Sequence, residues 1–250
     1  MPAMKHLALF TVTALLLLAG CTAQLKPVHN VARQTDPTDS TIYGLACEGS
    51  NDTIIVFLRQ PYNGSDPDTL NVLEATRRQQ VFGTVRIGDQ LAIMRNADDS
   101  CVADIVIVTQ DLLGQWAYKV KPTLRMRADM ENDSLHQTVS LPYDSIRRLL
   151  AEEREYGYVF KIDSVVVPLN IRPIGAEDES PVAYPPVKQY RQWKIYNCRV
   201  LLTEMTIASL GNGRPLAVDT AQLISLTTDT LVLRFADGDK GFYRKADTTN

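Results

Sequence analysis

The sequence predicts a mainly β protein: a small N-terminal curved sheet or partial barrel, followed by an antiparallel meander or barrel with one short helix. Short apolar runs rich in β-branched residues recur between residues 42 and 108. Apolar and polar residues alternate near the C-terminus, and clusters of turn-forming residues separate the runs. With 45% hydrophobic and 22% charged residues, the composition is that of a globular chain.

Residues 1–20 form a predicted targeting segment. Lys5 precedes an apolar run from Leu7 to Leu18, which is too short to span a bilayer. The residues that close the run, Leu18-Ala19-Gly20-Cys21, resemble a bacterial lipobox. This resemblance implies a lipoprotein signal peptide and acyl chains, such as palmitate, on Cys21. The alternative is a plain cleaved signal with a chance cysteine.

A lipid on Cys21 predicts a protein held in the cell envelope, with the membrane as its first partner. Residues 21–40 are polar and aperiodic, so we expect a flexible tether there. No acidic run follows Cys21, and such a run resembles the export mark of lipoproteins in Gram-negative anaerobes. The expected location is therefore the outer membrane facing the periplasm, with the cell surface as the alternative.

The charge balance argues against nucleic acid as a partner. The whole chain has a net charge of −3, and residues 21–250 have −4 because the first 20 residues carry one charge, Lys5. No block of basic residues occurs, whereas nucleic-acid affinity depends on clustered Lys and Arg.

Three cysteines remain after Cys21, namely Cys47, Cys101 and Cys198. An oxidising compartment permits one disulfide among them, and the sequence alone does not fix the pair. We expect Cys47 with Cys101, because both lie in the N-terminal half. No pair has the short spacing of a zinc site, so no structural metal is expected.

Residues 41–110 are expected to form the small β domain. Ile54 to Leu58, Leu91 to Met94 and Val102 to Val108 read as strands, and residues 60–68 as a turn-rich loop. Leu70 to Gln80 fits either a short helix or a strand. A sheet of this size lies near the lower limit for folding alone.

Residues 111–246 are expected to form the second β domain. Its first strand runs from Leu112 to Tyr118, with Trp116 and Tyr118 on one face. One helix is predicted from Tyr143 to Glu155, with Ser140 or Asp144 as its N-cap. Its apolar stripe consists of Ile146, Leu149 and Leu150.

Three hairpins complete this second half. Tyr156 to Ile162 and Ser164 to Ile171 read as paired strands, and so do Trp193 to Tyr196 and Val200 to Leu202. The last hairpin has the clearest pattern: Leu231, Leu233 and Phe235 alternate with polar or smaller residues, and Asp237 to Gly241 turns the chain into Phe242. A meander of this length curls or closes.

The Gly114-x-Trp116 opening, the meander and an arginine on the last strands resemble lipocalin-like domains, and the anchored layout resembles small lipoproteins of Gram-negative anaerobes. The resemblance implies a barrel whose mouth takes a small apolar molecule and whose closed end holds Trp116. Arg234 or Arg244 would stack on that ring.

The ligand-binding residues implied by this resemblance are Trp116, Tyr118, Tyr158, Phe160 and Trp193. Two features depart from the lipocalin pattern: Thr228-Asp229-Thr230 stands where lipocalins have Thr-Asp-Tyr, and the helix comes early. The alternative interpretation makes Gly114 a turn glycine and Trp116 a core residue.

Catalytic and cofactor motifs are missing from the sequence, so neither an enzyme nor a bound cofactor is expected. After Cys21 the histidines are His29, in the tether, and His136, in a polar stretch. Neither a Gly-x-Ser-x-Gly elbow nor a His-Glu-x-x-His motif occurs. Asp237 and Asp239 begin like a calcium loop, but Gly241 and Phe242 break the pattern. A pair of catalytic carboxylates, distant along the chain, stays open.

Asp followed by Ser or Thr and then by Ile, Leu or Val occurs six times, which resembles an acceptor for O-linked sugars in Gram-negative anaerobes. Turn entry and helix capping explain the same triplets, and we prefer that interpretation. The hydroxyl residues are Thr53, Thr69, Ser134, Ser145, Ser164 and Thr230.

These features predict a non-enzymatic binding or scaffolding module anchored in the envelope, with a small apolar molecule as its candidate ligand. The alternative is a protein-interaction subunit whose barrel is filled by its own side chains. A carbohydrate-active accessory enzyme is a third hypothesis. The state of the barrel interior distinguishes the first two.

Overall fold

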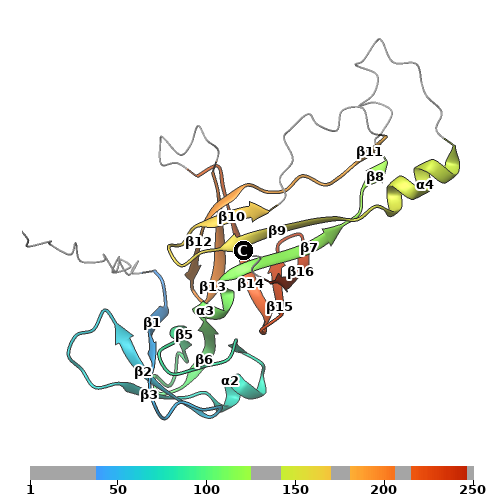
Figure 1. Cartoon of the computed structure of the whole chain (residues 1–250). Helices are drawn as coiled ribbons and strands as arrows, with labels where there is room; N and C mark the ends of the chain where they lie inside the picture. The colour runs from blue at the N-terminus through green and yellow to red at the C-terminus, as the bar shows by residue number, and fades with distance from the viewer. Residues whose placement is uncertain (1–37, 125–141, 170–180, 206–214, 247–250) are drawn as a thin grey trace, which may run out of the picture. The chain divides into compact units, whose positions relative to one another are not determined.

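The computed structural model describes residues 38–124, 142–169, 181–205 and 215–246 (Figure 1). Residues Asp36–Asn250 form one compact unit. The described residues build two large sheets, a two-stranded ribbon of β8 (Thr123–Leu124) with β11 (Val182–Ala183), and three helices. Within these ranges, no helix combines the length and apolarity needed to span a bilayer.

The first sheet is six-stranded, in the order β3-β2-β1-β5-β6-β4, and only the β4–β6 pair is parallel. A parallel bridge between Asn71 and Val102, with the Asn71 N–H donating to the Cys101 carbonyl over 2.8 Å, brings β3 to β6. The strands therefore curl into a small barrel, which confirms the predicted curved sheet or partial barrel. Its elements are β1 (Thr41–Ala46), β2 (Ile54–Gln60), β3 (Asp68–Asn71), α2 (Leu73–Arg77), β4 (Val81–Phe82), β5 (Gln90–Arg95) and β6 (Ala103–Val108).

Strict alternation of side chains explains how this small barrel folds. On β2, Ile55 and Phe57 are buried, whereas Ile54 is exposed and Val56 is half-buried. The inner side chains join those of the other strands and of α2 in one core cluster. Residues 70–80, which fitted a helix or a strand, contain both: β3 ends at Asn71 and α2 begins at Leu73. The strand order, with a helix between the third and fourth long strands, is that of an OB-fold.

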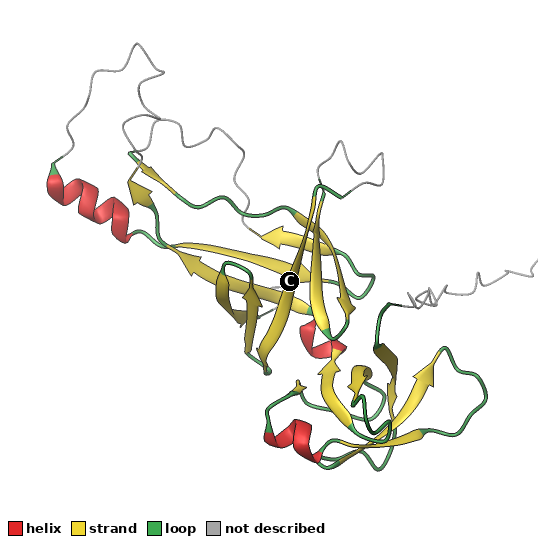
Figure 2. Cartoon of the chain, turned by 180° about the vertical axis from the view of Figure 1, so that it is seen from behind, coloured by secondary structure: helices red, strands yellow, loops and turns green. Residues whose placement is uncertain are grey.

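The second sheet contains eight antiparallel strands in the order β10-β9-β7-β16-β15-β14-β13-β12 (Figure 2). Successive strands of this sheet pair along the chain, except β10 and β12, which are its two edges, and the last strand, β16, pairs with the first, β7. The Trp193 N–H donates to the Ser164 carbonyl over 2.9 Å, and Val165 bridges Gln192, which brings β12 to β10. The strands are β7 (Gly114–Val120), β9 (Arg154–Phe160), β10 (Val166–Leu169), β12 (Tyr190–Tyr196), β13 (Arg199–Glu204), β14 (Ala217–Leu226), β15 (Thr230–Phe235) and β16 (Gly238–Lys245).

This connectivity makes the second sheet a nearly closed up-and-down barrel, the architecture of lipocalins. The predicted mainly β fold class is confirmed. All three predicted hairpins are present, and the turn between β12 and β13 consists of Asn197 and Cys198, both with positive φ (47° and 49°). Two adjacent residues with positive φ are the signature of a type I′ hairpin turn, whose twist matches that of the strands.

Three expectations from the sequence are wrong. The last hairpin turns at Ala236 and Asp237 instead of over Asp237 to Gly241, because β16 begins at Gly238, which pairs with Phe235. The helix α4 spans Tyr143–Ala151 instead of reaching Glu155, because β9 begins at Arg154 and pairs with β7. Its N-cap is Pro142, without a side-chain cap; Asp144 lies inside the first turn, and Ser140 lies outside the described residues. Cys47 and Cys101 form no disulfide: Cys47, Cys101 and Cys198 are all free thiols.

The chain passes from the first sheet to the second through α3 (Thr109–Leu112). Ala92 and Ile107 of the first sheet share one core cluster with Leu112 and with the barrel interior. The Gly83 N–H also donates to the Leu226 carbonyl over 3.1 Å. The boundary near residue 110 marks the change of sheet, and its status as a domain boundary stays a prediction.

A hydrogen-bonded clamp, formed by Asp39, Thr41 and the β12–β13 turn, joins the start of β1 to the second barrel. The Asp39 carboxylate accepts from the backbone N–H groups of Thr41 (3.0 Å) and Asn197 (2.8 Å). The buried Thr41 hydroxyl accepts from the Cys198 N–H over 2.9 Å. The Tyr43 hydroxyl lies 2.9 Å from Asp39 Oδ2 and 2.8 Å from the Ile195 carbonyl oxygen.

Substitution of Gly157 by alanine should lower the free energy of unfolding by about 1–3 kcal/mol through overpacking. A Cβ at this β9 position would lie 2.2 Å from the Trp116 carbonyl oxygen, so the β7–β9 ladder must shift. Gly241→Ala is the matched control, because nothing lies within 4 Å of its Cβ position on β16. Urea unfolding measures both, and equal effects would contradict this account of β7–β9 packing.

Candidate functional site

The end of the second barrel against which Leu112 of α3 and the first sheet pack is called the closed end below, and the fully buried Trp116 lies there. Its indole N–H donates to the Leu112 carbonyl over 2.8 Å. The Arg244 guanidinium lies 4.1 Å from the ring centroid, in cation–π geometry. Of the two predicted stacking partners, Arg244 is therefore the correct one, whereas Arg234 pairs with Asp239 on the outer surface (2.6 Å).

Arg244 also donates hydrogen bonds to three backbone carbonyls. Its guanidinium donates to Leu113 (2.7 Å), Asp111 (2.6 Å) and Thr228. Gly114 makes this approach possible: its φ is +114°, and a Cβ there would lie 2.7 Å from Arg244 Nη1. The glycine and the tryptophan of the predicted motif thus serve one structural unit at the closed end.

Aromatic side chains fill the middle of the barrel. Phe160 and Trp193 pack edge to face with ring centroids 5.5 Å apart, and the Trp193 indole N–H donates to the Lys161 carbonyl over 3.0 Å. All eight strands contribute to the same core cluster. The contributing residues are Trp116, Tyr158, Phe160, Val166, Tyr190, Trp193, Ile195, Val200, Leu202, Ala221, Leu223, Leu226, Leu231, Leu233 and Phe242.

A tyrosine cluster lies further from the closed end. Tyr118 packs edge to face on Phe242 (5.2 Å between centroids) and on Tyr156 (6.1 Å). Tyr158 packs on Tyr190 with centroids 5.4 Å apart. Tyr158 and Tyr190 are buried and Tyr118 is half-buried. These four tyrosines are called the tyrosine cluster below.

Charged groups border the tyrosine cluster. Asp219 accepts from the Tyr190 hydroxyl and from Lys188 Nζ (2.5 Å). Partial burial raises the pKa of Asp219, but the hydrogen bonds from Lys188 and Tyr190 outweigh it and hold the pKa below its ordinary value. Burial raises the pKa of Tyr190 well above 10, and the hydrogen bond to Asp219 adds to this shift. Burial also raises the pKa of Tyr158 well above 10, and the neighbouring Tyr118 adds to that shift. The hydroxyls of Tyr190 and Tyr158 are therefore protonated at neutral pH and can donate hydrogen bonds.

The predicted ligand-binding residues fall into two groups. Trp116, Phe160 and Trp193 pack at and above the closed end, with both indole N–H groups already bonded to backbone. Tyr118 and Tyr158 belong to the tyrosine cluster. The sequence analysis did not identify Tyr190 and Asp219 as site residues. Asp219, Ala221 and Leu223 alternate along β14, and this pattern could have placed Asp219 on the inner face of the barrel.

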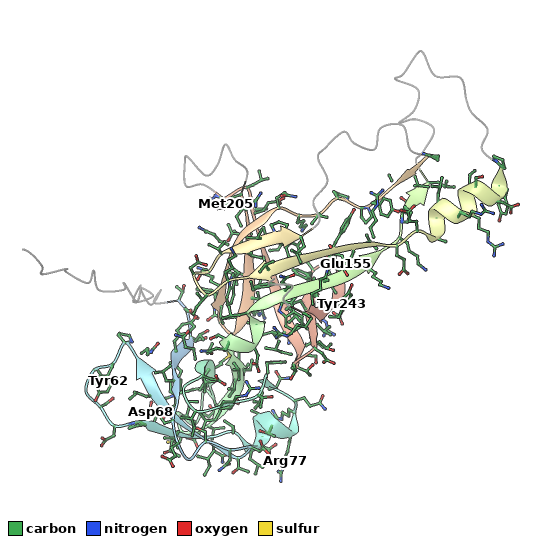
Figure 3. All side chains as sticks on the ribbon, in the orientation of Figure 1. Tyr62, Asp68, Arg77, Glu155, Met205 and Tyr243 are labelled. Carbon is green, nitrogen blue, oxygen red and sulfur yellow. The ribbon has the colours of Figure 1, made fainter. Side chains whose placement is uncertain are left out.

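A smaller polar cluster, formed by Glu155, Tyr243 and Lys245, lies on the outer face of the barrel (Figure 3). The carboxylate of Glu155 accepts from Lys245 Nζ over 2.5 Å and from the Tyr243 hydroxyl. The hydrogen bond from Lys245, with that from Tyr243, lowers the pKa of Glu155, and the same carboxylate raises the pKa of Tyr243 to about 12. These contacts tie β9 to β16 across β7.

The described residues contain no group of three or more His, Cys, Asp or Glu side chains placed to hold a metal ion. His29 and His136 lie outside the described residues, as does the Ser134 triplet. The other five Asp-Ser/Thr triplets lie at turns or at the starts of elements, although none of their side chains caps α4.

Comparison with known proteins adds little to this account. Neither a family model nor a curated protein matches the chain. A solved structure of a lipocalin-like protein from Bacteroides thetaiotaomicron VPI-5482 is 17% identical and covers 54% of this chain and 97% of its own, with a TM-score of 0.28. The lipocalin-like architecture stated above therefore rests on the strand order of the barrel itself.

Arg244→Lys should lower the free energy of unfolding by about 1.5–3 kcal/mol, because an ammonium cannot keep the forked hydrogen bonds and the stacking. The fluorescence of Trp116 should change with it. Arg234→Lys is the control, since exposed ion pairs contribute about 0–1 kcal/mol. Urea unfolding followed by fluorescence tests this, and similar losses in the two variants would refute the role of Arg244.

Stability should fall as the pH rises above about 9 to 10. Burial raises the pKa of Cys198 from 9.0 to about 12 and that of Tyr158 from 10.0, so the unfolded chain releases protons that the folded chain keeps. This contribution is complete below the unfolded pKa values and is lost above them. Tyr158→Phe should reduce the slope of unfolding free energy against pH by up to about 1.4 kcal/mol per unit above pH 10.

Tyr62→Phe is the control for the pH experiment, because the Tyr62 ring is 65% exposed. Urea titrations from pH 7 to 11.5 provide the slopes. A slope that is the same for Tyr158→Phe and the unchanged protein would show that the Tyr158 hydroxyl does not resist ionisation in the folded state.

Proposed function

We propose that this chain is a lipid-anchored envelope protein whose lipocalin-like barrel acts as a rigid interaction module. The observation that supports this choice is the filled interior: side chains from all eight strands belong to one core cluster, and the large aromatics inside it are fully or nearly buried. A barrel filled in this way offers its outer surface and loops, rather than its interior, to a partner.

The anchor is the second part of the proposal. A lipid on Cys21 would hold the module to a bilayer through the buried acyl chains, each CH₂ contributing about 0.8 kcal/mol. The first described residues enter the fold at the Asp39 clamp, so residues 21–37 separate the proposed anchor from the first fixed contact. The proposed location is the outer membrane, facing the periplasm.

A second candidate function is the binding of a small ligand at the tyrosine cluster. The observation that favours it is the gathering of tyrosine hydroxyls and the Asp219 carboxylate at one level of the barrel, next to Lys188. A ligand with an apolar body and a polar end would place the body against Tyr118 and Tyr158 and the end near Asp219. Trp116, Phe160 and Trp193 would form the floor. Neither candidate involves catalysis, and the non-enzymatic role is part of the proposal.

Native mass spectrometry of the full chain, purified from membranes of a Gram-negative host, distinguishes these functions. We expect residues 21–250 with acyl groups on Cys21 and no further small molecule. Cys21→Ser should leave the membrane fraction, whereas the control Cys47→Ser should stay in it. An unacylated chain would overturn the anchor.

A bound small molecule with a reproducible mass would overturn the filled-barrel module in favour of ligand binding. Loss of that mass in Tyr118→Ala, but not in the surface variant Tyr62→Ala, would assign it to the tyrosine cluster.

A further inference from the structure

A surface pocket of about 360 Å³ lies on the first sheet, away from the shared core. It is formed where the start of β2 meets the end of β3, beside the loop that joins β5 to β6. Its lining is mostly apolar and contains no aromatic residue. The lining residues are Thr53, Ile54, Thr69, Asn71, Leu73 and Cys101.

The pocket continues into an apolar strip on the outer face of the small barrel. Ile54, 39% exposed, lies opposite Asn71, and Val56 lies opposite Thr69. Leu58 lies opposite Leu45 further along, and both are half-buried. The inner neighbours of these residues fill the core cluster of the small barrel, so the strip is not itself needed to build that core.

The two loops that contribute Thr53 and Cys101 to the pocket carry acidic side chains. The β1–β2 loop, residues 47–53, carries Glu48 and Asp52, and the β5–β6 loop, residues 96–102, carries Asp98 and Asp99. Neither loop contains a lysine or an arginine. All four acidic residues are exposed, so they create a negative potential beside an apolar hollow.

The nearest basic side chains on these strands do not cancel this potential at the pocket. Arg95 and Arg59 both pair with Asp68, the first residue of β3 (Figure 3). Asn71, which lines the pocket, is the last residue of that strand. On α2, which begins at the lining residue Leu73, Arg77 pairs with Glu74 over 2.8 Å, and Arg78 follows as the C-cap. The two loops themselves therefore add only acidic side chains to the apolar lining.

OB-folds bind oligonucleotides and oligosaccharides on this face, and both classes of ligand fit this pocket poorly. A polyanion would meet four carboxylates, and the pocket offers no aromatic ring on which a base or a sugar could stack. A chain segment with an apolar side chain between basic residues satisfies both the lining and the acidic loops.

We propose that this pocket docks a basic peptide segment of a partner protein. An aliphatic side chain of the segment enters the pocket against Ile54 and Leu73, and flanking lysine or arginine side chains meet the carboxylates of the two loops. This inference rests on the proposed role as an interaction module and gives that module a partner chemistry. Attraction of this kind weakens with salt, because the Debye length falls from about 10 Å at 0.1 M to about 3 Å at 1 M.

Cys101 provides a local reporter of occupancy. Its thiol is exposed on the pocket lining, whereas Cys198 is buried and burial raises the pKa of the Cys198 thiol to about 12. The rate of alkylation of Cys101 by iodoacetamide, read by peptide mass mapping, therefore measures access to this pocket rather than access to the barrel.

The test uses the full chain in nanodiscs of phosphatidylcholine, a neutral lipid that does not attract basic peptides. The probe is the peptide Lys-Leu-Lys-Leu-Lys. We expect it to slow alkylation of Cys101 in 0.1 M salt and to lose this effect in 1 M salt. The matched peptides Glu-Leu-Glu-Leu-Glu and Lys-Ser-Lys-Ser-Lys should leave the rate unchanged, since each lacks one of the two required features.

Two variants with matched controls locate the effect. Ile54→Thr should weaken protection about tenfold in peptide concentration, whereas Ile87→Thr, at a residue 70% exposed in the loop between β4 and β5, should not. The triple variant Glu48→Gln, Asp52→Asn, Asp98→Asn should weaken it by about tenfold as well. A triple variant with the same charge change at Glu152, Asp163 and Asp237 is its control.

Unchanged alkylation of Cys101 with the Lys-Leu peptide at millimolar concentration would overturn the docking site. If the Lys-Ser peptide protects Cys101 as well as the Lys-Leu peptide does, the apolar part of the proposal is overturned. If the Glu-Leu peptide protects it equally well, the electrostatic part is overturned. These failures differ from failure of the proposed function, because a ligand held in the barrel changes the native mass without changing access to Cys101.

Discussion

The guanidinium of Arg244 is the contact on which the barrel depends most. It belongs to the last strand, yet it binds carbonyls of α3, of the residue before β7 and of the β14–β15 turn, and it covers the ring of Trp116. One side chain therefore links the last strand to the segment through which the chain leaves the first sheet and to the β14–β15 turn. Gly114 is required for the same reason, because any side chain there would occupy the space of the guanidinium.

A second set of contacts makes the two sheets parts of one packed unit. Asp39, Thr41 and Tyr43 bind the β12–β13 turn and the end of β12, and Ala92 and Ile107 enter the core that also contains Trp116. The small barrel thus has two different outer surfaces. The one formed by β5 and β6 is buried in the shared core, whereas the one formed by β2 and β3 carries the exposed apolar pocket.

The sequence predicts the elements whose pattern is local. Alternation identified β15, and the Asn197–Cys198 turn identified the β12–β13 hairpin, because strand faces and turn residues are encoded within a few positions. It does not predict the Asp39 clamp, which joins residues 158 positions apart, or the pairing of Tyr190 with Asp219. The predicted disulfide failed for the same reason: proximity in the N-terminal half does not bring Cys47 and Cys101 into bonding distance.

The position of β1 determines how the fold resists a force applied to its N-terminal end. The chain enters the described fold through a strand that is hydrogen-bonded on both sides, to β2 and to β5, and whose first residues also bind the second barrel. A force applied to the N-terminal end would therefore load two backbone ladders and the clamp together, in shear along the strand. Such an arrangement resists pulling from that end far better than an edge strand would, since an edge strand has one ladder to lose.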